Sequence, residues 1–135
     1  MKLKTLSCST IIIEPIVWQR IEYFAPIRKA VSYFEEHLAD RVTEKSIAAI
    51  ASFEETSFSK LFRKRIGLTF REFTEALRIS RAIEMMLESD QTLTQIAFAV
   101  GFGSLTTFTK AFRRQIGAAP SIYRKVLLKE HGLLS

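Results

Sequence analysis

Polar and basic side chains recur on one face of a short helical pattern at residues 104–115. Its outward positions are held by Thr106, Thr109, Lys110, Arg113 and Arg114. A lysine ammonium can bond a guanine edge or neutralise a phosphate, and an arginine guanidinium suits phosphate oxygens. These side chains therefore fit contact with a nucleic acid better than they fit bond-making chemistry.

Residues that could support catalysis or bind a metal are scattered along the chain. Cys8 is the single cysteine, so there is no thiolate cluster or disulfide framework, and we expect a reduced thiol. His37 has no companion histidine or cysteine at ligand spacing, so neither a metal site nor a cofactor is predicted. No serine–histidine–aspartate or carboxylate constellation occurs, and an enzyme is therefore the least favoured class.

The charge of the 135-residue chain is concentrated near its C-terminal end. The net charge is +6 and the pI is about 9.7. Between Gln91 and Lys129 there is no Asp or Glu, and the cations are Lys110, Arg113, Arg114, Arg124, Lys125 and Lys129. The rest of the chain is neutral, so a polyanion is the leading class of partner.

Two helices joined by a glycine turn must position this basic face. Thr92 and Gln95 form a capping-box pattern that begins the first helix. Its apolar side is formed by Ile96, Ala97 and Val100. Gly101 allows a positive φ in the turn, and Gly117 is placed to end the second helix. The second helix buries Phe108, Ala111 and Phe112. This layout is typical of a helix-turn-helix.

The same pattern occurs earlier in the chain, where residues 47–67 align with residues 96–117. The matched pairs are Ile47 with Ile96, Phe53 with Phe102, Phe58 with Phe108, Lys60 with Lys110, Phe62 with Phe112, and Gly67 with Gly117. The second copy has one extra residue at its turn, where Gly101 corresponds to Ser52. A positive φ at Ser52 would carry a small strain. Two copies are too few for a solenoid, so we interpret them as paired readers of a periodic partner.

A long helical pattern from Thr69 to Leu87 connects the two copies. Thr69 and Glu72 form a second capping box, and Ser89 ends the pattern. A helix of this length, about 19 residues, would span about 28 Å. One turn of B-DNA is about 34 Å, so a rigid connector can place two recognition helices in successive major-groove segments.

The flanking segments are less informative. Ile11 to Ile13 could form a short strand, and Glu14-Pro15 could begin a helix that Pro26 ends. Residues 1–26 could be a stub of an upstream module, a partner-binding helix, or a strap that packs Trp18 onto the domain, and we favour the strap. Helices are also predicted at 27–38, 44–51 and 122–128. No signal peptide and no transmembrane stretch is predicted, which favours a cytoplasmic, nucleoid-associated protein without membrane partners.

Residues 27–126 resemble the DNA-binding domain of the AraC/XylS family of bacterial transcription regulators. The resemblance rests on the first helix-turn-helix, on LRISRAIEMML at 77–87, and on IAFAVGFGSLTTFTKAFRRQIGAAPSIYR at 96–124, which is similar to the family's signature. It implies an all-α domain of seven helices with two helix-turn-helix subdomains joined by a long connector helix. We therefore assign residues 1–26 to an N-terminal extension, 27–128 to the domain and 129–135 to a tail.

The resemblance also implies which residues meet DNA. The candidates for base contact are Thr56, Ser59 and Lys60 in the first copy, and Ser104, Leu105, Thr106, Thr109 and Lys110 in the second. The candidates for phosphate contact are Arg63, Lys64, Arg113 and Arg114. Either lysine could instead neutralise a phosphate. Arg78 and Arg81 on the connector could bind the DNA backbone or pair with Glu75 and Glu84, and we favour the pairing.

The sequence departs from the family pattern at two places, and it leaves two functions possible. Ala119-Pro120 lacks the cap that Thr69 provides in the first copy. Glu54 and Glu55 begin the first recognition helix, where they suit the helix dipole but would repel nearby phosphates unless one accepts from a cytosine amine. The resemblance implies an activator on an asymmetric site. Because both readers lie on one chain, we expect a monomer on DNA, with RNA polymerase as a possible partner. The alternative is a DNA-binding-deficient anti-activator that sequesters RNA polymerase or a related regulator. The chain could be a short stand-alone regulator or a fragment of a longer one.

Overall fold

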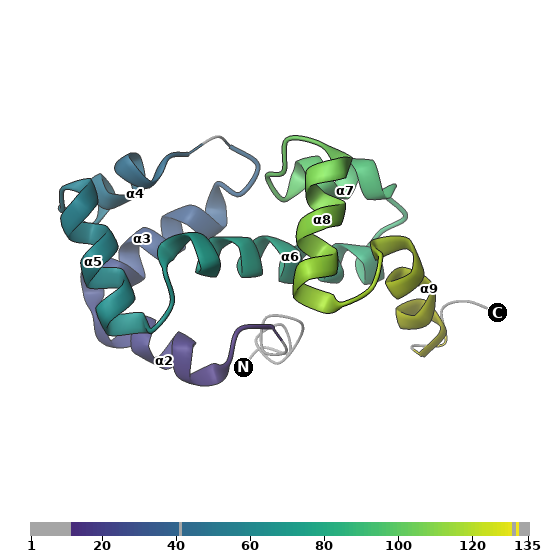
Figure 1. Ribbon diagram of the computed structural model, residues 1–135, viewed down its shortest axis with the longest axis horizontal. Helices are drawn as coiled ribbons and strands as arrows, with labels where there is room; N and C mark the ends of the chain where they lie inside the picture. The colour runs from purple at the N-terminus through teal and green to yellow at the C-terminus, as the bar shows by residue number, and fades with distance from the viewer. Residues whose placement is uncertain (1–11, 41, 131, 133–135) are drawn as a thin grey trace.

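The computed structural model describes residues 12–40, 42–130 and 132, and over these residues all regular structure is helical (Figure 1). The helices are α2 (Pro15–Tyr23), α3 (Ala25–Glu36), α4 (Glu44–Ile50), α5 (Glu55–Ile66), α6 (Phe70–Glu88), α7 (Leu93–Ala99), α8 (Leu105–Ile116) and α9 (Pro120–Glu130). The predicted all-α class, with two helix-turn-helix subdomains on a long connector, is confirmed. Helices α3 to α9 are the seven that the resemblance implied.

Helix α6 crosses the molecule and separates two groups of helices (Figure 1). Helices α2 to α5 lie at its N-terminal half, and α7 to α9 lie at its C-terminal half. Its buried side chains divide in the same way, because Phe70 to Leu77 join one apolar cluster and Ile79 to Met86 join the other. The connector therefore contributes to both cores in turn.

The first core is built around phenylalanines. Phe58, Phe62 and Phe73 are fully buried, and Phe70 meets both Phe58 and Phe62 edge-on at ring distances of 5.4 and 5.2 Å. The second core repeats this on a smaller scale, with Phe108 and Phe112 fully buried. Edge-to-face aromatic pairs are favourable beyond the area that they bury. The pairing of aromatic positions in the two copies thus reflects two equivalent cores.

The N-terminal segment packs on the first core. Trp18 on α2 meets Phe73 edge-on at 5.6 Å, and Arg20 donates a hydrogen bond of 3.0 Å to the carbonyl of Ile66. Ile12 and Ile13 are not in a strand, and Ile13 is buried. Ile11 and Cys8 lie outside the described residues. The favoured strap agrees with this packing of Trp18.

One predicted boundary is wrong. Pro26 does not end the helix that Glu14 begins, because α2 already ends at Tyr23 and Pro26 lies in the first turn of α3. A proline is tolerated there, since the N–H it lacks would have no partner within the helix. The predicted helix at 27–38 accordingly begins at Ala25 and ends at Glu36. Over the described part of the chain, no helix has the length and apolar character needed to cross a bilayer.

Candidate nucleic-acid interface

The two helix-turn-helix units have the same dimensions. In each unit a helix of 7 residues, α4 or α7, precedes a helix of 12 residues, α5 or α8. Thr43 and Thr92 cap the shorter helices through complete capping boxes. Gly67 and Gly117 end the longer helices in the left-handed conformation, each at φ 93°. The local signals therefore give each recognition helix a fixed start and end.

The turns between the helices differ in the residue that carries the positive φ. Ser52 adopts φ 65° in the first turn, and Gly101 adopts φ 103° in the second. The strain expected at Ser52 is therefore present. Ser52 is exposed, so its side chain meets no obstacle. Gly101 is different, because a Cβ there would lie 2.1 Å from the Leu38 carbonyl oxygen.

Glu54 caps the first recognition helix and is not a free acid at its tip. Its two carboxylate oxygens accept hydrogen bonds from the backbone N–H groups of Thr56 and Ser57, each at 3.0 Å. These backbone hydrogen bonds hold the pKa of Glu54 below its ordinary value. A carboxylate in this position also stabilises the positive end of the helix dipole. The carboxylate of Glu54 therefore suits the helix dipole, as expected, and the structure adds its two hydrogen bonds to the backbone.

Ser104 caps the second recognition helix. Its hydroxyl accepts a hydrogen bond of 3.1 Å from the backbone N–H of Thr107 and donates one to the Thr107 hydroxyl. Ser59 is also engaged, since its hydroxyl donates to a carboxylate oxygen of Glu44 on α4. A serine hydroxyl has one donor and two acceptor lone pairs. Each serine therefore keeps acceptor capacity and has already used its donor.

The remaining candidates for base contact lie on the outer face of their helices. Thr56, Lys60, Leu105, Thr106 and Lys110 are exposed, and Thr109 is half-buried. Leu105 is 39% exposed although it is apolar. Behind these side chains, the aromatic residues of α5 and α8 are fully buried. Each recognition helix thus has a buried apolar side and a polar side open to a partner.

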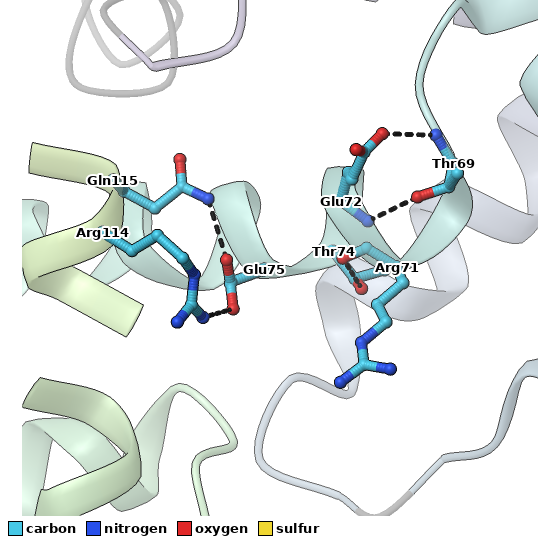
Figure 2. A network of polar contacts seen from close by, with 7 residues as sticks. All are labelled: Thr69, Arg71, Glu72, Thr74, Glu75, Arg114 and Gln115. Carbon is cyan, nitrogen blue, oxygen red and sulfur yellow. Dashed lines mark hydrogen bonds and ion pairs between the residues drawn. The ribbon is translucent and has the colours of Figure 1, made fainter. Parts of the chain in front are cut away.

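A pocket of about 310 Å³ lies beside the first recognition helix, where α4, α5 and the start of α6 meet. Lys60, Arg63 and Arg71 line it, and these three side chains form no hydrogen bond or ion pair within the described residues. Arg71 lies in the first turn of α6, where the helix dipole disfavours a cation. Figure 2 shows its guanidinium extended away from the connector. Sequence reasoning had not identified Arg71 as a site residue.

The two adjacent arginines on the second recognition helix have different surroundings. Arg114 forms an ion pair with Glu75 on the connector, and Gln115 donates a hydrogen bond of 2.9 Å to the same carboxylate (Figure 2). Partial burial raises the pKa of Glu75, but the hydrogen bonds from Arg114 and Gln115 and the nearby Arg71 charge outweigh it. The pKa of Glu75 is consequently below its ordinary value. Arg113 is exposed and has no such partner in the described part of the chain.

Three other arginines form hydrogen bonds or ion pairs within the domain. Arg124 on α9 donates hydrogen bonds of 2.7 and 2.8 Å to the carbonyls of Gln91 and Ser89. Arg81 pairs with Glu35 at 3.0 Å and approaches Glu84 at 3.9 Å. The expected pairing of Arg78 with a glutamate is wrong, because Arg78 donates to three backbone carbonyls instead. The reason is its position, since its guanidinium enters the space between the two subdomains.

Two helix-turn-helix units on one connector define a bipartite DNA-binding domain, and the comparisons agree. A model described as a helix-turn-helix domain matches residues 47–126. The HTH-type transcriptional regulator YobQ of Bacillus subtilis (strain 168) is 32% identical over 101 residues. That match covers 75% of this chain and 42% of YobQ. The transcriptional activator RhaS of Citrobacter koseri is 29% identical over 75% of this chain and 36% of its own length.

A solved structure extends the likeness to a protein bound to DNA. The crystal structure of the DNA-binding domain of AdpA in complex with a target DNA superposes with a TM-score of 0.74 at 27% identity. The superposition covers 78% of this chain and 95% of that domain. The chain belongs to the AraC/XylS family of helix-turn-helix transcription regulators, a class of DNA-binding proteins rather than enzymes. It spans less than half the length of the curated relatives named above.

Proposed function

We propose that the chain binds DNA as a monomer and inserts α5 and α8 into adjacent major-groove segments. The observation that supports this most directly is the exposed polar face on each of two equivalent helices, whose apolar faces are buried in separate cores. Both helices are held by the same connector of 19 residues. The complex that AdpA's domain forms with a target DNA supports duplex DNA as the partner.

The proposed base contacts follow from the exposure of each side chain and from the hydrogen bonds that it already makes. Thr56, Lys60, Thr106 and Lys110 are exposed and can reach base edges. Because Ser59 and Ser104 have used their donors, we expect them to accept from the amine of cytosine or adenine. Leu105 suits the methyl group of thymine, as does the methyl of Thr109. The second unit should therefore prefer a sequence that contains thymine.

The proposed phosphate contacts are shared unequally between the two units. In the first unit Lys60, Arg63 and Arg71 surround one pocket, and Lys64 is exposed nearby on α5. In the second unit Arg113 is exposed and has no ion-pair partner among the described residues, whereas Arg114 must leave Glu75 before it can meet a phosphate. Phosphate contacts position a protein on the duplex without specifying sequence. We therefore add Arg71 to the proposed contacts and rank Arg114 below Arg113.

Activation of transcription is proposed from the likeness to RhaS, which is named as a transcriptional activator. An activator acts through the transcription machinery, so RNA polymerase is the proposed protein partner. The alternative is an anti-activator that keeps the fold and does not bind DNA. The exposed, uncommitted polar side chains on both recognition helices favour the activator.

Selection from a random duplex library tests the proposal. The purified chain should enrich one asymmetric sequence, protect about 20 bp in a footprint, and sediment with it as one protein per duplex. Enrichment of a palindrome bound by two copies would contradict the monomer. Enrichment of no sequence, by a chain that still captures RNA polymerase or a relative, would favour the anti-activator.

A further inference from the structure

The two subdomains have separate apolar cores, so something else must fix the angle between them. One cluster ends at Leu77 on the connector and the other begins at Ile79, and Ile12 packs against both. The connector helix by itself fixes the relative orientation of the two subdomains only weakly if each subdomain can shift on the part of the helix that it contacts. The residue between the two clusters is Arg78, and its side chain makes polar contacts to both subdomains at this junction. The ion pair of Glu75 with Arg114 links α6 to α8 separately.

Arg78 contacts both subdomains with one nitrogen. Its Nη1 donates to the carbonyl of Leu38 at 3.4 Å, in the segment that follows α3 of the first subdomain. The same atom donates to Val100 at 3.3 Å and to Gly101 at 3.4 Å, in the turn of the second helix-turn-helix. The guanidinium also lies over the Phe34 ring, 4.9 Å from its centroid. One side chain on the connector thus bridges segments from the two readers.

The partners of this guanidinium explain how a cation is tolerated here without a carboxylate. Leu38 follows the C-terminal end of α3, and Val100 is the C-cap of α7. Carbonyls at helix C-termini carry partial negative charge, so the C-cap carbonyl of α7 favours a cation here. Burial lowers the pKa of the Arg78 guanidinium below its ordinary value. Arginine, unlike lysine, keeps its charge and offers several donors in a fixed plane under these conditions.

The backbone of the second turn is fitted to this contact. A Cβ at Gly101 would lie 2.1 Å from Nη1 of Arg78 and 2.1 Å from the carbonyl oxygen of Leu38. Neither approach is possible for a real side chain, so Gly101 is required by the contact between subdomains as well as by its φ. Ser52 occupies the matching position of the first unit, is exposed, and keeps its side chain. The two turns differ because only the second faces the other subdomain.

We propose that Arg78 is a positioning residue that fixes the angle between the two helix-turn-helix units and thereby the spacing of half-sites that the protein accepts. Without the guanidinium, the carbonyls of Leu38, Val100 and Gly101 lose a charged donor that the two subdomains share. The second unit would then rotate about the connector. The part concerning half-sites rests on the proposed function, and the part concerning the angle does not.

The angle can be measured without DNA. In a Cys8→Ser background, spin labels at Ala49→Cys on α4 and Thr94→Cys on α7 report the distance between the units, and both positions are exposed. Electron–electron double resonance should give one narrow distance distribution for the parent chain. Arg78→Met should broaden it or add a second distance. An unchanged distribution in a folded Arg78→Met chain would overturn the proposal.

Arg20→Met is the matched control. Arg20 also donates to a backbone carbonyl, that of Ile66 at 3.0 Å, but both residues belong to the first subdomain. This substitution removes the same side chain and should leave the distance distribution narrow. Broadening of the same size in Arg20→Met would show a general loss of rigidity and would count against a specific role for Arg78.

Two further variants keep the proposal testable if Arg78→Met does not fold. Arg78→Lys retains a charge but places it on a shorter side chain without the planar guanidinium that lies over Phe34, so the contacts of Nη1 are weakened. Gly101→Ala disrupts the same contact from the side of the second turn. Both should broaden the distribution, and narrow distributions in both would overturn the proposal. In library selection, Arg78→Lys should enrich the parent's half-sites at several spacings. If the parent enriches no sequence, the proposed function fails, whereas the distance measurement still decides the role of Arg78.

Discussion

Glu75 on the connector binds Arg114 on the second recognition helix, and this ion pair divides two neighbouring arginines into different roles (Figure 2). Gln115 binds the second oxygen of the same carboxylate, so α8 is held to α6 at two points. Arg113 extends into solvent without a described partner. The number of Lys and Arg residues between Gln91 and Lys129 therefore overstates how many cationic side chains are available to contact DNA phosphates.

Replacing Arg113 by Ala should weaken binding to all duplexes similarly and reduce the dependence on salt. Each phosphate contact contributes a log–log salt slope of about −0.9, so the slope should fall by about one unit. Arg114→Ala should change the slope less, because its charge is balanced by Glu75. Titrations of a random duplex at several salt concentrations measure both. Equal changes for the two variants would show that DNA displaces Glu75.

Glu75→Gln provides the complementary test of the ion pair. The substitution keeps the shape of the side chain but removes the charge that neutralises Arg114. Affinity for random DNA should rise at low salt, and the slope should steepen by up to about one unit. A weaker salt dependence in this variant would contradict our account of Arg114.

Lys60→Ala should reveal whether the first unit reads sequence. We expect a loss of about 1–3 kcal/mol on the selected site and little change on random DNA, because a base contact discriminates between sequences. Lys64→Ala, one turn further along α5, is the control and should weaken both duplexes alike. Equal losses of binding free energy on the two duplexes for Lys60→Ala would indicate that Lys60 contacts the DNA backbone.

Acid should destabilise the domain partly through two carboxylates with lowered pKa values. Glu54 and Glu75 both have a pKa below the ordinary 4.5, so each contributes stability that is fully present above that value. This contribution is lost as the pH falls through each folded-state pKa. Urea unfolding between neutral and acid pH should therefore show a smaller decline in Glu54→Gln and in Glu75→Gln than in the parent. An identical decline would show that neither carboxylate is linked to folding.

Substitutions at the two turn residues, Ser52 and Gly101, should have opposite effects on the free energy of unfolding. Ser52→Gly should raise the free energy of unfolding by up to about 1 kcal/mol, since it relieves a left-handed conformation that costs an L-residue roughly 1–2 kcal/mol. Gly101→Ala should lower it by at least about 1–2 kcal/mol, because it adds that strain and a collision with Leu38. Chemical denaturation measures both, and a stabilised Gly101→Ala chain would contradict the packing.

Arg124→Met should separate fold-supporting charge from DNA-binding charge. Losing two charged hydrogen bonds to Gln91 and Ser89 should lower the free energy of unfolding by about 1.5–3 kcal/mol. The salt slope of DNA binding should stay that of the parent, in contrast to Arg113→Ala. A reduced slope would place Arg124 at the DNA backbone.

The sequence alone determined the features that depend on neighbouring residues. The capping boxes at Thr69 and Thr92 involve residues three positions apart, and a glycine ends each recognition helix. Such signals act within one helical turn, so they can be read without knowing the fold. The internal repeat and the 3.6-residue periodicity then predicted two equivalent units and the faces that they bury.

Only the tertiary structure decided what each charged residue does. Arg78 binds carbonyls 22 to 40 positions away, and Arg114 binds a carboxylate 39 positions away. In the sequence these two residues resemble Arg113, which stays free for a partner. An arginine side chain takes its role from whichever oxygens lie within hydrogen-bonding reach, and packing of the helices sets that distance. The repeat therefore predicts where DNA would be met, while the folded chain selects which cations remain to meet it.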